Sequence, residues 1–500
     1  MCTIPFFAAA ILFACVSALP LKNETSGANF QNAMGKEEPK QGWTSSPNER
    51  GTADILWSCG STVILCCWSM LCLNVPGPKD TYWIIIRRKV WIFSLTLCGP
   101  EVCAISSMGQ YLSAHQSSRD FKAAGISDWT LQHAFFADMG GFVLQTRDWV
   151  PFPITAKQLL WLTQRDYISV SPAVFRHIKD RNKVDGMMRF IMVLQTLWFL
   201  ANFFGRIALG LAITTIELTT VAFIYASLPM VFLWRHKPAE VGVAEVLVTD
   251  ASMTEILLAG GEAAREPYSK TPLDFIDRKE WAWSIYWHHL RNILRYLRIA
   301  AGPQVRPADR VSNFDIPEIP TWVFCLGAVY YFGFAAIFVA GWNMSLPTHT
   351  EQLLWRVAGL LCLGTLFVGE IITEMAFTVW PYVRARWLQS CEEGKSKFNP
   401  TIAHEHEVSP DERNSRYSRP SNPPRPRPRT IWNWIRNNSV GQDKQVSMQL
   451  RVLLPMYVIG LLYITARVFI IVEDILELRS LPLSCYKTPD WQQFIPHLGG

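Results

Sequence analysis

Four acidic residues interrupt stretches of sequence that are otherwise apolar: Glu101, Asp138, Glu217 and Glu370. Ionisable groups at membrane depth are expensive, so each of these residues is a candidate member of a substrate, ion or proton pathway. Counted along the apolar stretches, the first three fall near the middle and the fourth falls somewhat toward the cytoplasmic side. The four acids therefore predict a polar site near the bilayer midplane that relays protons, binds a cation or protonates a lipophilic substrate.

The same acids also allow a structural interpretation. Each one could pair with a basic or polar neighbour, such as Arg189, Arg206 or Asn202, and so hold two helices together. Both interpretations stay open for any single acid, whereas four acids in four helices favour a polar site. Arg467 lies toward the lumenal end of the last apolar segment, where a long side chain is expected to reach the interface.

The segments that carry these acids are long enough to cross a bilayer. Half of the 500 residues are apolar and only 18% are charged, whereas about one quarter is charged in a typical soluble domain. Seven segments of about 20 residues are predicted to span the membrane: 53–74, 90–108, 187–204, 207–233, 321–342, 353–380 and 450–472. An eighth segment, 129–146, contains His133, Asp138 and a pair of glycines, so hydropathy alone does not decide whether it spans.

The placement of Lys and Arg along the chain favours counting 129–146 as a membrane span. Lys and Arg accumulate on the cytoplasmic side of membrane proteins. With a lumenal N-terminus and eight spans, four segments become cytoplasmic and hold 4, 7, 11 and 12 Lys and Arg: 75–89, 147–186, 234–320 and 381–449. Losing the eighth span alone would move most of this charge to the lumen. The predicted fold class is therefore an all-α polytopic bundle of about eight spans, with 53–233 as its first half and 321–380 as a hairpin. The alternative has seven spans, with 129–146 buried or re-entrant.

The ends of the chain are predicted to be lumenal. Residues 1–18 are a short apolar run that ends in small residues, as a cleavable signal peptide does, with an uncleaved anchor as the alternative. Residues 19–52 are polar and predicted to be disordered, and residues 473–500 form a lumenal tail. Asn23 and Asn343 each begin a glycosylation sequon. Such a protein belongs in the endoplasmic reticulum or the plasma membrane.

Residues 278–299 predict an amphipathic helix within the cytoplasmic segment 234–320. Trp283 and Trp287 belong to an apolar stripe, and Arg291, Arg295 and Arg298 follow the same spacing on another face. We expect this helix to lie on the anionic cytoplasmic leaflet. The alternative is a helix packed on the protein's own bundle.

The loop 381–449 contains a Pro- and Arg-rich core, SRPSNPPRPRPR, within residues 391–446. Its composition buries too little apolar surface to fold, so a disordered loop with a polyproline II core is predicted. It is either a solvated linker or a ligand for SH3 or WW modules.

The sequence contains no motif for nucleophilic catalysis, metal binding or nucleotide binding in a suitable context. No nucleophile elbow, zinc motif, P-loop or dinucleotide fingerprint occurs in a suitable context, so we predict no metal and no cofactor. The cysteines of the apolar segments are expected to act as small hydrophobes without a structural disulfide. Positive charge beside apolar spans indicates lipid contact rather than nucleic-acid binding.

Several strings carry a resemblance to a known group of proteins: GTADILWSC, FFADMGGF, PFPITAKQL, THTEQLLWR and LRSLPLSCYKTPDWQQFIPH. From about residue 43 to the end, except for the Pro/Arg-rich loop, the chain resembles a large group of uncharacterised fungal integral membrane proteins. The resemblance implies a fungal source. Some members lie beside genes of specialised metabolism, but the resemblance carries over no activity and no site.

Three functions follow as hypotheses. The first is a protein that handles a proton, an ion or a small amphipathic molecule at a midplane polar site. The second is an intramembrane enzyme that uses one of the acids as proton donor to a lipophilic, isoprenoid-type substrate. The third is a membrane scaffold or receptor that acts through its basic cytoplasmic segments.

Overall fold

The computed structural model describes most of the chain outside its first residues and its Pro/Arg-rich loop. The described residues are 39–45, 50–69, 71–169, 186–239, 241–278, 282–297, 306–313, 319–375, 379, 383, 386, 431–439, 443 and 446–488. The predictions for the signal peptide, Asn23, Arg298 and the polyproline core lie outside these residues.

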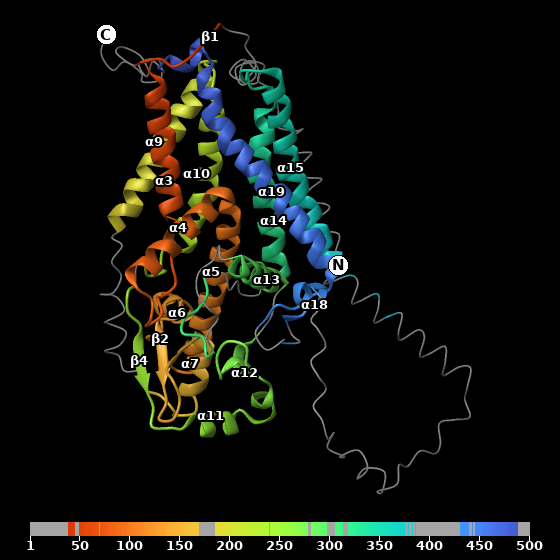
Figure 1. The fold of residues 1–500 in the computed structure, drawn as a ribbon. Helices are drawn as coiled ribbons and strands as arrows, with labels where there is room; N and C mark the ends of the chain where they lie inside the picture. The colour runs from red at the N-terminus through yellow and green to blue at the C-terminus, as the bar shows by residue number, and fades with distance from the viewer. Residues whose placement is uncertain are drawn as a thin grey trace, which may run out of the picture.

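Long helices form a bundle, as Figure 1 shows. Five of them are long and apolar enough to cross a membrane, or six if a bent pair is counted as one span. These apolar helices indicate a lipid bilayer environment. The bundle helices are α3 (Thr52–Ser69), α4 (Tyr82–Cys98), α5 (Pro100–Ala123), α9 (Gly186–Ala208), α10 (Thr215–Leu233), α14 (Thr321–Ala340), α15 (His349–Glu374) and α19 (Leu450–Leu476).

One end of the bundle gathers the first and last described segments of the chain. There β1 (Lys40–Gln41) pairs antiparallel with β5 (Leu481–Pro482), at the top of Figure 1. The turn between α9 and α10, the short helix η2 (Gly341–Asn343) and the short helix η7 (Leu483–Tyr486) lie at this end too. We call it the β1–β5 end.

The opposite end carries a small α/β unit that the all-α prediction did not contain. Its sheet has the order β3-β2-β4, with β2 antiparallel to β3 and parallel to β4. Four aromatic side chains, Phe121, Trp129, Phe136 and Phe142, are buried around it, and Phe121 stacks on Trp129. The elements of this β2 sheet unit are α6 (Leu131–Asp138), β2 (Phe142–Gln145), β3 (Phe152–Ile154), α7 (Ala156–Thr163), β4 (Glu245–Val248), α11 (Met253–Ala259) and α12 (Asp274–Asp277).

The predicted span 129–146 is wrong. The helix α6 has 8 residues, about 12 Å at 1.5 Å per residue, which is too short for a bilayer. Gly140 follows with a φ of +82°, a left-handed conformation that favours glycine, and the chain turns into β2. A Cβ at Gly141 would lie 2.4 Å from the Phe136 carbonyl oxygen, so only glycine fits this turn. The segment is buried within the β2 sheet unit.

The predicted span 90–108 is broken in the middle. Helices α4 and α5 meet at Gly99 and Pro100 and are bent by 109°. Pro100 occupies the first turn of α5, where its missing N–H leaves no hydrogen bond unmade. The pair is a broken span or a re-entrant loop, and its apex lies inside the bundle (Figure 1).

The amphipathic helix α13 (Ala282–Tyr296) packs on the bundle, as the alternative interpretation predicted. Ile285 and Tyr286 are buried in a cluster with Leu453 and Met456 of α19. Trp287 packs against the cluster of Ile319 and Val323. The prediction for the side chain of Trp283 lies outside the described residues.

The last part of the loop that was predicted to be disordered is helical. Residues Ile431–Arg436 form α18, and the following residues hold α13 through hydrogen bonds. His289 contacts Asn438 Oδ1 at 2.6 Å and the Val446 carbonyl oxygen at 2.7 Å. Arg278, which lies between α12 and α13, also forms an ion pair with Asp443.

Candidate functional site

The four predicted acids do not share one depth in the bundle. Asp138 ends α6 in the β2 sheet unit, outside the long apolar helices. Glu217 lies in the first turn of α10, at the β1–β5 end. Glu370 lies one turn before the opposite end of α15. Only Glu101, at the apex of α4 and α5, lies in the interior of the bundle.

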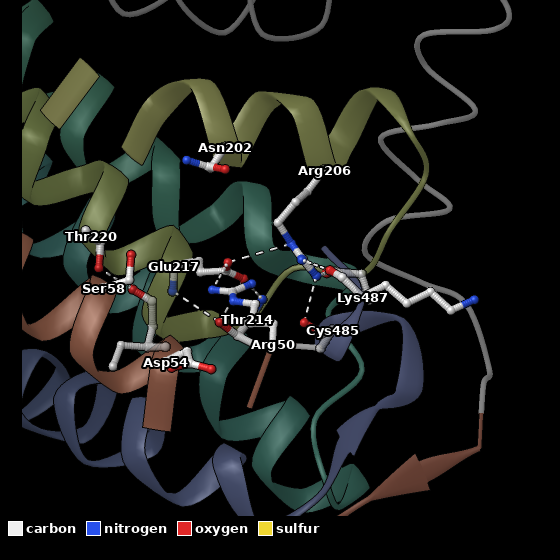
Figure 2. A network of polar contacts seen from close by, with 12 residues as sticks. Arg50, Asp54, Ser58, Asn202, Arg206, Thr214, Glu217, Thr220, Cys485 and Lys487 are labelled. Carbon is white, nitrogen blue, oxygen red and sulfur yellow. Dashed lines mark hydrogen bonds and ion pairs between the residues drawn. The ribbon is translucent and has the colours of Figure 1, made fainter. Parts of the chain in front are cut away.

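Glu217 forms a capping network at the β1–β5 end, shown in Figure 2. The Thr214 amide and hydroxyl donate to its Oε2 at 2.9 and 3.0 Å. Its Oε1 lies 2.7 Å from Arg50 Nη2 and 3.7 Å from Arg206 Nε. This carboxylate is therefore fully paired, which confirms the structural interpretation for Glu217.

Arg206 connects the same network to the C-terminal segment. Its Nη1 donates to the Lys487 carbonyl oxygen at 2.7 Å. Its Nη2 lies 2.6 Å from the Ala212, 3.1 Å from the Ser484 and 3.0 Å from the Cys485 carbonyl oxygens. The guanidinium thus ties η7 and the residues after it to the turn between α9 and α10.

Two further acids join α19 to α10. The Thr215 amide and hydroxyl donate to Glu477 Oε2 at 2.7 and 2.5 Å. The Thr219 hydroxyl donates to Asp474 Oδ1 at 3.1 Å. Both acids belong to residues 473–500, which were predicted to form a lumenal tail, and their contacts make this end of the bundle a structural joint.

Asp138 is held inside the β2 sheet unit. Ser113 Oγ donates to its Oδ2 at 2.8 Å and the Ala156 amide donates to its Oδ1 at 3.2 Å. Burial raises the pKa of Asp138, against the lowering effect of these donors. The geometry gives this residue a local role between α5 and α7.

Lys237 is a buried cation just beyond the end of α10. Its Nζ donates to the Cys72 carbonyl oxygen at 3.0 Å and to Gln110 Oε1 at 2.9 Å. Burial lowers the pKa of Lys237 to about 8, because the low dielectric penalises the charged form. It forms no ion pair in the part of the chain that the structure describes.

Glu101 is held at the helix break by two tyrosines. It is only 2% exposed. The Tyr463 hydroxyl of α19 donates to its Oε1, and the Tyr331 hydroxyl of α14 donates to its backbone carbonyl oxygen at 3.0 Å. Its Oε2 has no hydrogen-bond partner among the described residues.

Arg467 faces the same break from α19 and has 0% exposure. Its Nε donates to the Cys98 carbonyl oxygen at 3.0 Å, at the end of α4. The guanidinium lies 4.7 Å from the ring centroid of Phe338, 5.2 Å from that of Phe334 and 5.8 Å from that of Phe223. Neither Nη1 nor Nη2 has a hydrogen-bond partner in the described part of the chain.

We call these residues the Glu101–Arg467 site: Glu101, Phe223, Phe334, Phe338, Tyr463 and Arg467. Arg467 precedes the end of α19 by nine residues, about 14 Å at 1.5 Å per residue. The expectation that it reaches the lumenal interface is therefore wrong. Sequence reasoning found Glu101 but missed Arg467 as its neighbour. The available signal was that both are ionisable residues well inside apolar segments.

The fold and this site define a mostly helical membrane protein with a buried, charged site at a broken helix. Its sequence belongs to a family of unknown function, DUF8562, whose model matches residues 28–259 and 436–498. The matched residues include both Glu101 and Arg467. No curated protein and no solved structure matches the chain.

Proposed function

We propose that this protein binds and moves a small amphipathic molecule, ion or proton at the Glu101–Arg467 site. One observation carries the proposal. Among the described residues, two nitrogen atoms of the buried Arg467 and one carboxyl oxygen of the buried Glu101 have no hydrogen-bond partner. Leaving such groups unsatisfied is expensive, so a bound ligand is the natural partner.

The helix break supports the same proposal. Irregular backbone at membrane depth is tolerated where it is buried in protein or lines a cavity. In many transporters, discontinuous helices of this kind form the substrate site. Here the free carboxylate oxygen belongs to the second residue of α5, directly after the break.

We infer that α3 crosses the bilayer together with the five helices that are apolar enough to do so, and that α4 and α5 together enter and leave on one side. The six helices are α3, α9, α10, α14, α15 and α19. Two of the eight predicted spans, 90–108 and 129–146, then do not cross the bilayer. Because the number of crossings falls by two, every later segment keeps the side that the eight-span prediction gave it. The four basic segments therefore remain on the cytoplasmic side, and the β1–β5 end is lumenal. The lumenal turns 209–214 and 343–352 contain no Lys or Arg.

Glycosylation tests this orientation. Asn343 is exposed at the β1–β5 end. In an Asn23→Gln background, which removes the other predicted lumenal sequon, glycosidase should shift the mobility of the protein, and Asn343→Gln should abolish that shift. In the background that carries both changes, an engineered sequon at the opposite end, made by Glu262→Asn with Ala264→Thr, should stay unmodified. Modification of that engineered sequon would overturn the orientation.

Flux through reconstituted vesicles tests the proposed function. Three probes are measured separately: protons with an internal pH dye, a labelled lipophilic acid and a labelled lipophilic amine. Glu101→Gln and Arg467→Met should each change the flux of at least one probe, whereas Arg451→Met on the exposed start of α19 should change none. If both site variants carry every probe at the wild-type rate, the proposal fails.

An intramembrane enzyme is the second candidate function, because Glu101 Oε2 has no hydrogen-bond partner among the described residues and could carry the proton that a general acid donates. The substrate of such an enzyme would be lipophilic and of the isoprenoid type. This substrate class fits the resemblance to fungal proteins, some of which lie beside genes of specialised metabolism. Arg467 weighs against it, since the cationic intermediates of such reactions would be repelled by a permanent positive charge. A deletion strain that loses a metabolite or accumulates its precursor would support the enzyme over the binding protein.

The scaffold hypothesis concerns the cytoplasmic segments. It predicts loss of function on deletion of residues 391–430, whereas a transport or enzyme role tolerates that deletion. The exposed surface of α13, which includes Tyr296, is the part that we propose contacts the anionic leaflet. An endoplasmic reticulum or plasma membrane location remains part of this proposal.

A further inference from the structure

The geometry points to a lipophilic carboxylate as the ligand of the Glu101–Arg467 site. The carboxylate would lie on Nη1 and Nη2 of Arg467, and the apolar body would lie against Phe223, Phe334 and Phe338. This inference rests on the proposed function and names the chemical class of its substrate.

The guanidinium is oriented for such a ligand. Its Nε is committed to the Cys98 carbonyl oxygen, and three aromatic rings surround its central carbon. These contacts hold the plane of the group, and the two Nη atoms are the donors of this guanidinium that have no hydrogen-bond partner among the described residues. A carboxylate matches two parallel N–H donors of arginine in a bidentate arrangement.

The charge of the site favours a monoanion. Arginine does not lose its proton inside proteins, so a cationic ligand would meet a fixed positive charge. A dianion such as a phosphate monoester would add two negative charges where Glu101 already supplies an acidic group. One carboxylate compensates one guanidinium in a medium where unpaired charge is expensive.

The walls of the site favour an apolar body. Phe223, Phe334 and Phe338 are each 1% exposed and come from α10 and α14. A ligand that reaches the Arg467 guanidinium therefore meets aromatic side chains. The apolar body of an amphipathic acid would make favourable contact with these rings, whereas an inorganic anion would not.

Direct binding tests the inference on the purified full-length chain in lipid nanodiscs. The probes are a fluorescent fatty acid, its methyl ester and the corresponding alkyl amine. Wild type should bind the acid at least about tenfold more tightly than the ester, because charge-assisted hydrogen bonds contribute about 1.5 to 3 kcal/mol. Arg467→Met should abolish this preference, and Arg467→Lys should weaken it because lysine lacks the planar fork. Arg451→Met is the matched control on the same helix and should bind as wild type.

Glu101→Gln separates an acid site from a cation site. It should keep or strengthen binding of the fatty acid, since glutamine cannot carry a negative charge beside the bound carboxylate. If instead the amine binds best and Glu101→Gln abolishes that binding, the ligand class is wrong while the proposed function stands. If the acid binds to wild type, Arg467→Met and empty nanodiscs alike, it partitions into lipid and the inference is overturned. Unchanged flux in both site variants would overturn the proposed function itself.

Discussion

Two buried arginines, Arg206 and Arg467, serve the bundle in opposite ways. Arg206 donates to four backbone carbonyl oxygens and approaches a carboxylate that is itself fully paired. Arg467 donates to one carbonyl oxygen and keeps two nitrogens free among the described residues. Both side chains are at most 1% exposed, so burial does not distinguish them. The difference lies in whether the chain itself compensates the charge, and it separates a structural joint from a binding site.

The most destructive change should be Arg206→Met. It leaves Arg50 as the cation that pairs with Glu217 and removes one donor from each of four carbonyl oxygens. Breaking one partner of a buried charged network typically costs about 3 to 5 kcal/mol of unfolding free energy. Unfolding of the purified protein in detergent measures the loss, with Arg451→Met as the exposed control. Equal stability of the two variants would remove the distinction between the arginines.

Lys237 sharpens the comparison, because a buried lysine can lose its charge and a buried arginine cannot. The pKa of Lys237 is about 8 in the folded protein, below the ordinary 10.5. Between these two pH values the unfolded chain binds a proton that the folded chain does not, so the free energy of unfolding rises with pH. The rise is about 3 kcal/mol in order of magnitude, and it disappears again as pH falls toward 8.

The measurement compares unfolding of wild type and Lys237→Met from pH 7 to pH 10.5. Subtracting the unfolding free energy of the variant from that of wild type at each pH removes the contributions of other titrating groups. The variant should lack the rise and should gain stability relative to wild type at pH 7. Parallel pH profiles would show that Lys237 keeps its proton when buried.

A smaller effect is expected for Thr215→Val, which removes one donor from the structural joint. The hydroxyl is lost, while the backbone amide still donates to Glu477. A hydrogen bond to a charged group contributes about 1.5 to 3 kcal/mol, and the remaining donor should limit the loss to about 1.5. Thermal unfolding of this variant beside Thr465→Val, whose hydroxyl lies on the exposed face of α19, isolates the contribution of the joint.

The smallest effect on stability should accompany Arg467→Met, although this variant loses its function. Arg467 forms one hydrogen bond and no ion pair within 4.0 Å among the described residues, so the relief of the desolvation cost of its buried charge should offset the contacts that Met does not replace. The expected change in unfolding free energy is below about 1 kcal/mol in either direction, with flux and acid binding lost. A loss as large as that of Arg206→Met would place Arg467 in the structural class instead.

Much of the helical architecture could be predicted from hydropathy. The five candidate spans among the described helices correspond to predicted segments, because a 20-residue apolar run has few other uses. The pairing of Glu217 with Arg206 was also among the predicted alternatives. Their segments are neighbours along the chain, so few arrangements separate them.

Long-range features escaped prediction for a physical reason. The parallel pairing of Phe142 with Glu245 joins residues about one hundred positions apart, and short apolar runs do not distinguish a strand from a helix. The depth of Arg467 depends on Cys98 and on rings from α10 and α14, none of which adjoin it in sequence. Gly140 and Gly141 marked the right place for a turn, but only tertiary packing shows that the chain turns into a sheet.

The reach of Arg206 to the Lys487 carbonyl oxygen spans 281 residues and therefore imposes an order on biosynthesis. At about 5 to 20 residues per second, the ribosome needs roughly 15 to 55 s after making Arg206 before its last acceptor exists. During that interval the nascent α9–α10 hairpin carries a charged, unfinished tip. A chain truncated before η7 would leave Arg206 without three of its four carbonyl acceptors.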